Sequence, residues 1–497
     1  MASSLTKDSA STPGSEKTFF GHPRGLATLF MTEMWERFSF YGMRALLPLY
    51  LIAPGGLHMD GATATAIYSV YLSLVYLLAM PGGWFADRFW GPRKTVVIGS
   101  GIVILGHITL ALPSSGSFFA GLGLVALGSG LLKANISTMV GHLYKGPQDP
   151  RRDAGFTVFY IGINVGGFLA PLTIGTIGEN VNWHFGFALA AVGMALGLVQ
   201  FLLGSRHLSA ESDVVVKPAT KQERAKALKQ SLYWAIGAAV FYLIVVGTGH
   251  YTLNWILVPL SIIGLVIPVL VLARMKRDKE LTDDEQSKVS GYIWFFVVAA
   301  IFWMIYDQNG STLSIFGEES TTNTLLGFHF PTSWYQSLNP IMIMALAPVV
   351  ASIWLWLNKR GKEPSTAVKF ASSLVLMGIS FAVFLIPLID TATNGGKVSP
   401  MWLVAIYFVQ TVGELCLSPV GLSVTTKMAP AKYTGQMMGV WFLAVTAGDS
   451  ITALLSTAGV NLNTKGAVGA EVLIAVIAGL GFWMYRGRVK KLMGSVN

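Results

Sequence analysis

The sequence predicts an all-α membrane protein. Hydrophobic residues make up 53% of its 497 residues and charged residues only 12%, whereas an ordinary soluble domain carries about 25% charged residues. Apolar runs of about 18 residues or more recur along nearly the whole chain, and each can cross a hydrocarbon layer of about 30 Å. The net charge of +10 comes from Lys and Arg residues in the polar segments between these runs. We therefore expect a lipid bilayer around the protein and no nucleic-acid partner.

Fourteen apolar spans are bounded by turn residues and charges. Two sets of six flank a middle pair, and we number the two sets as spans one to twelve. The first set lies near residues 26–52, 63–86, 95–112, 118–142, 154–177 and 184–203. The middle pair covers 231–248 and 251–271, and the second set lies near 289–316, 336–357, 370–388, 400–425, 436–460 and 467–485.

This order predicts two six-helix bundles with a transmembrane hairpin inserted between them. The expected parts are a cytoplasmic tail (1–25), an N-terminal bundle (26–203), a linker (204–230), the hairpin (231–271), a second linker (272–288), a C-terminal bundle (289–485) and a short cytoplasmic tail (486–497). Residues 1–18 are polar and lack the apolar region of a cleavable signal peptide. The hairpin carries few charges, and we assign it no function.

The distribution of basic residues predicts that both termini are cytoplasmic. If the N-terminus lies inside, 30 of the 35 Lys and Arg residues fall in cytoplasmic segments. Only Lys397 and Lys465 fall outside, and Arg37, Arg44 and Lys133 lie within spans. This bias matches the known preference of basic residues for the cytoplasmic side of a membrane.

Residues 82–94, with the sequence GGWFADRFWGPRK, lie at the cytoplasmic end of span two. The Gly pair permits close approach of helices, and Asp87 with Arg88 and Arg93 can form a charge network between helices. A generic basic loop would not need this spacing of Gly, Asp, Arg, Gly and Arg. The segment resembles the loop signature of the major facilitator superfamily, which implies the major facilitator fold of two six-helix bundles.

We single out eight charged residues inside the predicted spans, namely Glu33, Glu36, Arg37, Arg44, Lys133, Asp307, Glu414 and Asp449. Burying a charge in a span costs about 2.5 to 3.5 kcal/mol, so such residues mark functional sites by default. In span one, Glu33, Glu36, Arg37, Phe40, Tyr41 and Arg44 share an arc of about 140° of a helix. A static ion-pair cluster is one explanation of this face. We favour a proton-coupled site, because one carboxyl can take a proton while the other keeps Arg37 paired.

The run EMWERF in span one resembles the proton-coupled oligopeptide transporter (POT) family, whose first helix carries an E-x-x-E-R signature. Further similar runs are GSGLLKANIS around Lys133, FTVFYIGINVGGFLAP around Asn164 and GELCLSPVGLSVTTKMAP around Glu414. These motifs follow the family's order and cover most of the chain. The resemblance implies a symporter of the bacterial type that imports di- and tripeptides by alternating access, driven by the proton electrochemical gradient.

The resemblance also implies roles for individual residues. Proton coupling falls to Glu33, Glu36, Arg37 and Asp307. Substrate binding falls to Arg37, Tyr41, Arg44, Tyr76, Lys133, Asn164, Asn339, Glu414 and Trp441. In this set Arg37 and Lys133 match groups that bind the peptide carboxylate, whereas Asn164, Asn339 and Glu414 match groups that hold its amino terminus. Two ion pairs are expected to gate the transporter, Arg44 with Asp307 and Lys133 with Glu414.

Physical chemistry agrees with these roles. A zwitterionic peptide needs cations at one end of its site and an anion with amide oxygens at the other, and Arg can grip a carboxylate with two hydrogen bonds. Lys133 and Glu414 lie about midway along their spans, where such transporters place their substrates. A buried salt bridge that packs helices together is the alternative role for this pair.

Three departures from the family pattern affect the expected site. Span seven carries Asp307, preceded by Tyr306, where the family commonly has Glu, and the shorter Asp reduces the reach toward Arg44. Span eleven has Ala444 and Val445 where relatives often have Ser, and it adds Asp449. Asp449 is either a second proton site or an acid paired locally with Ser450 and Thr446.

The resemblance implies no cofactor besides the coupling proton, and the chain shows no metal-ligand spacing around His107 or His142. We expect a monomer in a bacterial plasma membrane, because the short loop between spans nine and ten lacks the added domain common in the eukaryotic branch.

Other functions remain open at this point. A related importer could carry another anion such as nitrate, and a protein of the same fold could exchange drugs for protons. A nutrient receptor that transports nothing would not need charges midway along spans in both bundles. An enzyme is not expected, because the sequence has no phosphate-binding loop, no Ser/His/Asp set and no HExxH motif. Uptake must then draw on an ion gradient. Each proton that moves inward across a membrane potential of about 100 mV supplies about 2.3 kcal/mol.

Overall fold

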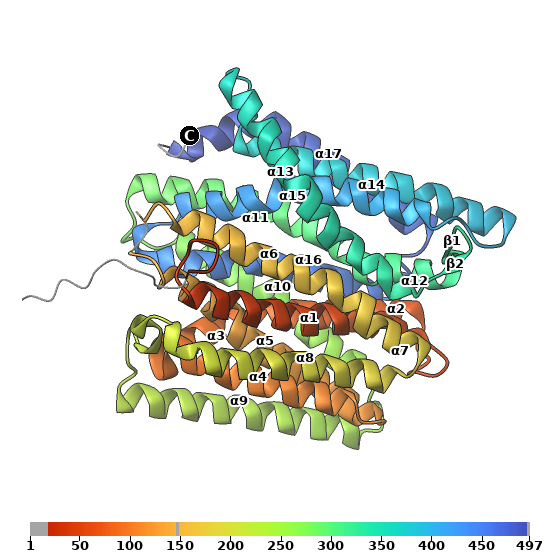
Figure 1. The fold of residues 1–497 in the computed structure, drawn as a ribbon, viewed down its shortest axis with the longest axis horizontal. Helices are drawn as coiled ribbons and strands as arrows, with labels where there is room; N and C mark the ends of the chain where they lie inside the picture. The colour runs from red at the N-terminus through yellow and green to blue at the C-terminus, as the bar shows by residue number, and fades with distance from the viewer. Residues whose placement is uncertain (1–17, 146–148, 495–497) are drawn as a thin grey trace, which may run out of the picture.

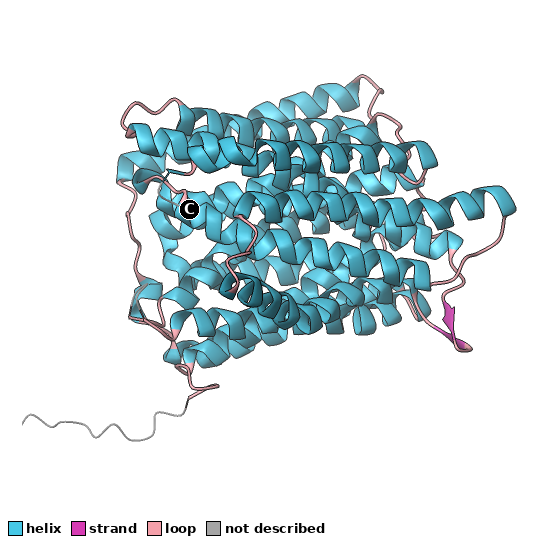
Figure 2. Ribbon diagram, turned by 90° about the horizontal axis from the view of Figure 1, so that it is seen from above, coloured by secondary structure: helices cyan, strands magenta, loops and turns pink. Residues whose placement is uncertain are grey.

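A computed structural model describes residues 18–145 and 149–494. The predicted tail up to residue 17, with Lys7 and Lys17, lies outside the described residues. Helices dominate, and the one sheet in the described ranges is a hairpin of β1 (Thr324–Leu325) and β2 (Phe328–His329), in which Leu325 pairs with Phe328 (Figure 2). The expected helical class of the fold is confirmed.

The N-terminal half contains helices α1 to α8. Their bounds are α1 Gly25–Ile52, α2 Gly61–Leu77, α3 Ala79–Phe85, α4 Gly91–Leu110, α5 Ser115–Gly141, α6 Arg152–Ala170, α7 Thr176–Asn180 and α8 Trp183–Gly204. A π-helical turn, Ala86–Trp90, joins α3 to α4, and another, Pro171–Gly175, joins α6 to α7. Pro171 opens the second turn because proline has no backbone N–H to continue the α-helical pattern.

The middle of the chain forms α9 (Lys221–Gly247) and α10 (Asn254–Lys276). Short 3₁₀ turns at Ser205–His207 and Ala210–Asp213 precede them. Helix α9 thus begins ten residues before the predicted span 231–248, inside the predicted linker 204–230. A capping box between Thr220 and Glu223 starts this helix within the polar segment.

The C-terminal half contains helices α11 to α17. Their bounds are α11 Asp283–Tyr306, α12 Thr312–Ser320, α13 Leu338–Lys359, α14 Thr366–Asn394, α15 Met401–Lys427, α16 Thr434–Thr457 and α17 Lys465–Leu492. Three 3₁₀ segments, Asp307–Gly310, Thr332–Ser337 and Ala431–Tyr433, lie before α12, α13 and α16.

Twelve helical segments among the described residues are long and apolar enough to cross a membrane. One of them, Gly61–Leu110, covers the second predicted span and most of the third. Helix α1 is not among the twelve because Glu33, Glu36, Arg37 and Arg44 interrupt its apolar sequence.

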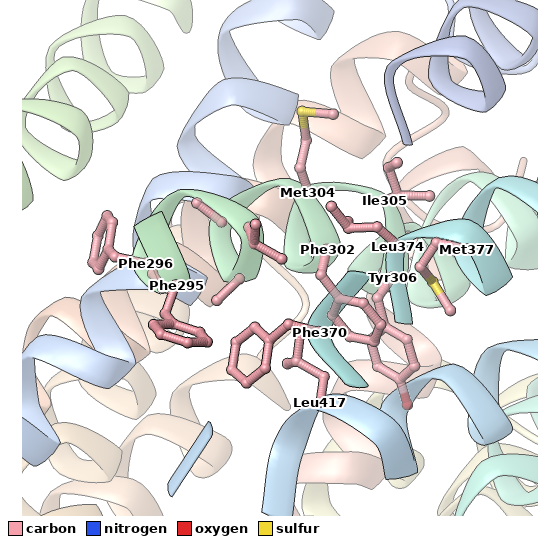
Figure 3. Close-up of a cluster of buried hydrophobic side chains, with 14 of the residues drawn as sticks. Phe295, Phe296, Phe302, Met304, Ile305, Tyr306, Phe370, Leu374, Met377 and Leu417 are labelled. Carbon is pink, nitrogen blue, oxygen red and sulfur yellow. The ribbon is translucent and has the colours of Figure 1, made fainter. Parts of the chain in front are cut away.

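The helices form two bundles that lie side by side. In Figure 1, α1, α4, α5 and α8 lie below, α11, α13, α14, α15 and α17 lie above, and α6 and α16 lie between them. We call the end where α1 begins and α17 finishes the termini end, and the opposite end the far end. Helix α2 packs on α16 across the junction of the bundles, and α6 packs on α13. Each half has its own apolar core, and the aromatic core of the second half is shown in Figure 3.

Close helix packing explains the first glycine of the pair in the 82–94 segment. A Cβ atom on Gly82 would lie 2.2 Å from the carbonyl oxygen of Gly130 in α5. The basic residues of this segment do not pair with Asp87 as predicted. Arg88 pairs with Glu223 at 2.6 Å, and Arg93 pairs with Asp213 at 3.0 Å. The charge network therefore ties the following linker and α9 to the N-terminal bundle.

The middle helices do not pack along each other as a hairpin. Helix α10 packs on both α2 and α16. A Cβ atom on Gly264 of α10 would lie 2.1 Å from Ser450 Oγ and 2.8 Å from Ser73 Oγ, so this glycine permits the close approach. Helix α9 lies at the outer edge of the N-terminal bundle with one buried residue, Val245 (Figure 1). The two helices meet near their connecting turn, where Tyr242 donates a hydrogen bond to the Trp255 carbonyl.

Candidate functional site

The polar face of α1 is buried, as a functional face within a membrane span would be. Glu33, Glu36 and Arg37 are 4%, 2% and 6% exposed. Arg37 Nε lies 2.7 Å from Glu33 Oε1 and 2.8 Å from Glu36 Oε2. Both acids of the signature therefore contact one guanidinium group.

The two acids are not equivalent. The single N–H of Arg37 Nε donates its hydrogen bond to Glu33, so Glu36 Oε2 is close to the cation but has no hydrogen-bond partner. A buried carboxylate oxygen without a hydrogen bond is costly as a charge and can be stabilised by taking a proton. Glu36 therefore has a buried oxygen that is free to hold a proton.

Lys133 of α5 rests on aromatic rings instead of an acid. Its Nζ lies 3.8 Å from the ring centre of Tyr76 and 4.8 Å from that of Phe40, and it is buried without a hydrogen-bond partner. The guanidinium carbon of Arg37 lies 5.5 Å from the same Phe40 ring. Two buried cations of the N-terminal bundle thus share one aromatic ring.

Arg44, two turns further along α1, reaches the other bundle. Its Nη2 donates to Asp307 Oδ1 at 2.9 Å and to Asn309 Oδ1 at 2.8 Å. Its Nε donates to Tyr68 Oη at 2.5 Å. The expected contact between Arg44 and Asp307 is present, so the shorter Asp side chain does reach the arginine.

A break in the seventh span places Asp307 at this position. Helix α11 ends at Tyr306, and the 3₁₀ turn Asp307–Gly310 separates it from α12. The break frees the carbonyl of Asn309, which accepts hydrogen bonds from Tyr407 Oη at 2.9 Å and Gln336 Nε2 at 2.7 Å. Discontinuous helices of this kind commonly form ion and substrate sites in transporters.

Glu414 of α15 is held by neighbours in its own bundle. Tyr306 Oη and Asn339 Nδ2 donate to its Oε2 at 2.5 Å and 2.8 Å. Figure 3 shows Tyr306 at the edge of the aromatic core, where its ring stacks on Phe302 at 5.4 Å. Both donors use one oxygen, which leaves Oε1 of Glu414 free for a cationic group such as a peptide amino terminus.

Several predicted site residues are placed differently from expectation. Lys133 and Glu414 make no ion pair with each other in the part of the chain that the structure describes. Trp441 is buried among the C-terminal core side chains, 6.4 Å from the Phe370 ring. The aromatic partner of Tyr76 across the bundles is instead Phe442, at 5.9 Å. Asn164 is buried and donates to the Tyr160 carbonyl within its own helix.

Two acids that the sequence did not point to join the polar contacts: Glu471, which is buried, and Glu179, which is partly buried. Glu471 of α17 accepts a hydrogen bond from Gln308 Nε2 at 2.6 Å, beside Asp307. It was missed because it lies close to the start of the last predicted span, although an acid in that position is itself a signal. Glu179 of α7 accepts hydrogen bonds from the backbone N–H groups of Thr332 and Ser333. Backbone donors leave no mark in the sequence, so that contact could not be predicted.

Polar contacts join the bundles at the far end. The oxygens of Glu179 lie 2.8 Å and 2.9 Å from the Thr332 and Ser333 nitrogens of the other bundle. Trp334 Nε1 donates to Thr176 Oγ1 at 2.8 Å, and Ser337 Oγ donates to the Phe168 carbonyl at 2.8 Å. Together with Arg44 and Asp307, these contacts join the halves on one side of the site.

Comparisons with known proteins agree on one family. The sequence profile of the POT family matches residues 93–471. A di-/tripeptide transporter of Lactococcus lactis subsp. cremoris is 42% identical over 495 residues, which cover 97% of this chain and 99% of that protein. The peptide transporter YePEPT of Yersinia enterocolitica is 36% identical, covering 90% of each chain. A crystal structure of a peptide transporter POT in complex with sulfate superposes with a TM-score of 0.91 at 43% identity, covering 96% of this chain and 97% of that one.

Proposed function

The chain belongs to the POT family, and from this membership we propose that it is a proton-coupled symporter that imports di- and tripeptides by alternating access. It is a membrane transporter and not an enzyme. The named relatives are peptide transporters and match it along nearly their whole length. No cofactor besides the coupling proton is needed.

The main support for this proposal is that the N-terminal bundle places two cations, and the C-terminal bundle an acid, within the molecule. Arg37 and Lys133 lie around the Phe40 ring in the N-terminal bundle. Glu414 lies in the C-terminal bundle, fixed by Tyr306 and Asn339. A peptide in its zwitterionic form places its carboxylate with the two cations and its amino group with Glu414, which satisfies groups that are otherwise costly to bury. Tyr41, Tyr76 and Asn164 complete the proposed substrate-binding set, and Phe442 takes the aromatic position expected of Trp441, whose side chain lies in the core.

Proton coupling acts through Arg37. A proton on Glu36 removes one of the two acids that hold the guanidinium, so Arg37 becomes free to bind a peptide carboxylate. Proton and peptide then bind in a linked manner, as a symporter requires. One proton gains about 2.3 kcal/mol per 100 mV on moving inward, and a tenfold concentration of solute costs about 1.4 kcal/mol.

Alternating access uses the contacts between the bundles. The ion pair of Arg44 and Asp307 closes the far end, and a proton on Asp307 weakens it. Lys133 and Glu414 are proposed to pair in another state of the cycle, because each lies midway along its span without the other as a partner here. A peptide between them would separate the two charges.

The finer architecture also belongs to this proposal. We assign fourteen spans, by adding α1 to the twelve apolar segments and dividing Gly61–Leu110 into two. The proposed parts are 1–25, 26–203, 204–230, 231–271, 272–288, 289–485 and 486–497, with the correction that α9 begins at Lys221. The termini end faces the cytoplasm of a bacterial cell, the protein lies in the plasma membrane, and it works as a monomer.

Uptake into vesicles tests the proposed function. Purified protein in liposomes should accumulate radiolabelled dialanine when an inward proton gradient and an inside-negative potential are applied. Unlabelled tripeptide should compete, whereas nitrate should not. Accumulation that ignores the proton gradient, or that nitrate inhibits while tripeptide does not, would contradict the proposal.

A further inference from the structure

A basic pocket of about 390 Å³ lies where α10 ends, at the termini end of the molecule. Its lining consists of Arg274, Arg277, Asp278, Lys279, Lys432 and Tyr433. Four of these six side chains are cations. The pocket is separate from the transport site, whose charged residues lie inside the bundles.

Two segments that are far apart in the sequence build the pocket. Arg274, Arg277 and Lys279 lie on the last turn of α10 and just after it. Lys432 and Tyr433 lie on the 3₁₀ turn between α15 and α16. Asp278 joins the two, because its Oδ2 accepts hydrogen bonds from Lys432 Nζ and Tyr433 Oη, both at 2.6 Å. The shape of the pocket is therefore fixed by direct contacts.

The pocket keeps an excess of positive charge. Lys432 is neutralised by Asp278 and by Glu280, the latter at 2.7 Å. The hydrogen bonds from Lys432 and Tyr433 hold the pKa of Asp278 well below its usual range, so this acid stays ionised and paired. Arg274, Arg277 and Lys279 make no ion pair with any other residue in ranges 18–145 and 149–494. Three exposed cations are thus available to an anion.

An apolar surface leads into this pocket. Val266 and Leu270 of α10 are 45% and 61% exposed, and they precede Arg274 and Arg277 on one face of the helix at steps of about three to four residues. Helix α10 is among the segments that can cross a membrane. Its exposed apolar residues therefore contact lipid chains, and the cations that end this face lie at the level of the headgroups.

We propose that this pocket binds the headgroup phosphate of an anionic phospholipid, whose acyl chains lie along Val266 and Leu270 of α10. The lipid belongs to the leaflet at the termini end, which is the inner leaflet in the proposed orientation. Arg274 and Arg277 bind the phosphate, since guanidinium groups suit it, and Lys279 adds a third positive charge. Basic pockets between spans on this side of a membrane are suited to such lipids.

Binding of this lipid also has a structural consequence. One wall of the pocket belongs to α10, which packs on both bundles, and the other belongs to the turn that leads into α16. A phosphate between them adds a link between α10 and the start of α16, next to the link that Asp278 makes. The proposal goes beyond peptide transport, and its test does not depend on the transported substrate.

Photolabelling of the full-length protein tests the proposal. Protein in phosphatidylcholine vesicles receives a trace of phosphatidylglycerol that carries a photoreactive group in its acyl chain, and the labelled peptides are identified by mass spectrometry. We expect label on residues 266–274 of α10, at least tenfold above that from a matched phosphatidylcholine probe. Equal labelling by the two probes would show that this surface of α10 binds lipids without regard to their charge, and would overturn the proposal.

Matched variants separate the pocket from general surface charge. Arg274→Gln with Arg277→Gln and Lys279→Gln should lower the labelling of α10 by tenfold or more. Lys221→Gln with Lys226→Gln and Lys229→Gln removes the same charge from α9, at the same end, and should leave the label unchanged. The double variant Arg274→Lys with Arg277→Lys keeps the charge and should retain most of the label, which controls for folding.

Two further results would overturn the proposal. Unchanged labelling of the triple variant in the pocket would show that its cations do not bind the lipid. Loss of wild-type labelling on addition of millimolar inorganic phosphate, at constant ionic strength, would show that free phosphate displaces the lipid, and would assign the pocket to a soluble anion. Labelling that resists phosphate and falls with the three cations supports the lipid site.

Discussion

Arg44 and Asp307 connect the two bundles through one nitrogen atom, because Arg44 Nη2 lies 2.9 Å from Asp307 Oδ1 and also donates to Asn309 Oδ1. The other oxygen of Asp307 is buried without a hydrogen-bond partner. A proton on that oxygen would remove the charge of Asp307 without displacing any other hydrogen bond. The contact therefore has the geometry of a latch that a proton can release.

The first prediction concerns this latch. Asp307→Asn removes the charge permanently, so we expect the far end to open more often at neutral pH. Distances between spin labels at the far ends of α1 and α12 should shift toward longer values, and the shift should no longer depend on pH. Combining Arg44→Asp with Asp307→Arg should restore a closed pair but not its response to protons. A distance distribution that Asp307→Asn leaves unchanged would show that the pair is only structural.

The second prediction concerns the two acids of α1. Because Arg37 Nε donates its hydrogen bond to Glu33 and leaves Glu36 without one, Glu36→Gln should abolish proton-driven uptake of dialanine and spare peptide exchange. Glu33→Gln should also abolish driven uptake and weaken exchange, since Arg37 loses its hydrogen-bond acceptor. Glu363→Gln, at an exposed acid of the C-terminal half, serves as the control. Wild-type driven uptake by the double Gln variant would contradict a coupling role.

The sequence was sufficient for the helical class and for the charged face of α1. Both depend on local spacing: apolar runs predict spans, and residues three or four apart share a helix face. The polar cluster of Glu33, Glu36 and Arg37 is a contact between residues of one helix, so it could be predicted from one segment. The contact between Arg44 and Asp307, which are far apart in the sequence, was predicted instead from the resemblance to a family.

Contacts that depend on tertiary packing could not be predicted in this way. Helix α10 packs across both bundles because Gly264 allows approach to Ser73 and Ser450, and no local pattern indicates such a neighbour. Trp441 was assigned to the site as an aromatic residue, yet its side chain lies in the core while Phe442 faces Tyr76. One residue of shift along a helix turns a side chain by about 100°, which sequence resemblance alone does not resolve.

The third prediction concerns Tyr306, which donates to Glu414 at 2.5 Å. Tyr306→Phe removes a hydrogen bond to a charged group, worth about 1.5 to 3 kcal/mol, and leaves Glu414 with Asn339 as its donor. We expect KM for dialanine to rise about tenfold or more, with a smaller effect on kcat. Tyr292→Phe is the matched control, because Tyr292 is also buried and bonds to Thr425 in the same bundle. An equal change of KM in both variants would indicate a general packing effect.

The fourth prediction concerns Glu179 at the far end. Its two carboxylate oxygens each accept a backbone N–H of the other bundle, whereas Gln offers one oxygen and an NH₂ group that cannot accept. Glu179→Gln should therefore open the far end more often, seen as faster labelling of a cysteine placed at Thr332 by a reagent that does not cross membranes. Glu319→Gln alters a nearby exposed acid and should have no effect. Unchanged labelling in Glu179→Gln would contradict a role in closure.

The last prediction separates binding from stability at Lys133. Because its Nζ rests on Tyr76 and Phe40 and has no acidic partner, Lys133→Met leaves no unpaired carboxylate behind, and the protein should insert and unfold much like the wild type. Arg44→Met is the matched variant for comparison, because it leaves Asp307 buried without its cation. It should lower the free energy of unfolding by about 3 to 5 kcal/mol.

If Lys133 binds the peptide carboxylate, its loss removes a charge-assisted hydrogen bond worth about 1.5 to 3 kcal/mol. The affinity for dialanine should then fall about tenfold to a hundredfold. Equilibrium exchange in vesicles and thermal unfolding in detergent measure the two effects independently. Wild-type affinity in Lys133→Met, or a loss of stability as large as in Arg44→Met, would assign Lys133 to helix packing and not to the substrate.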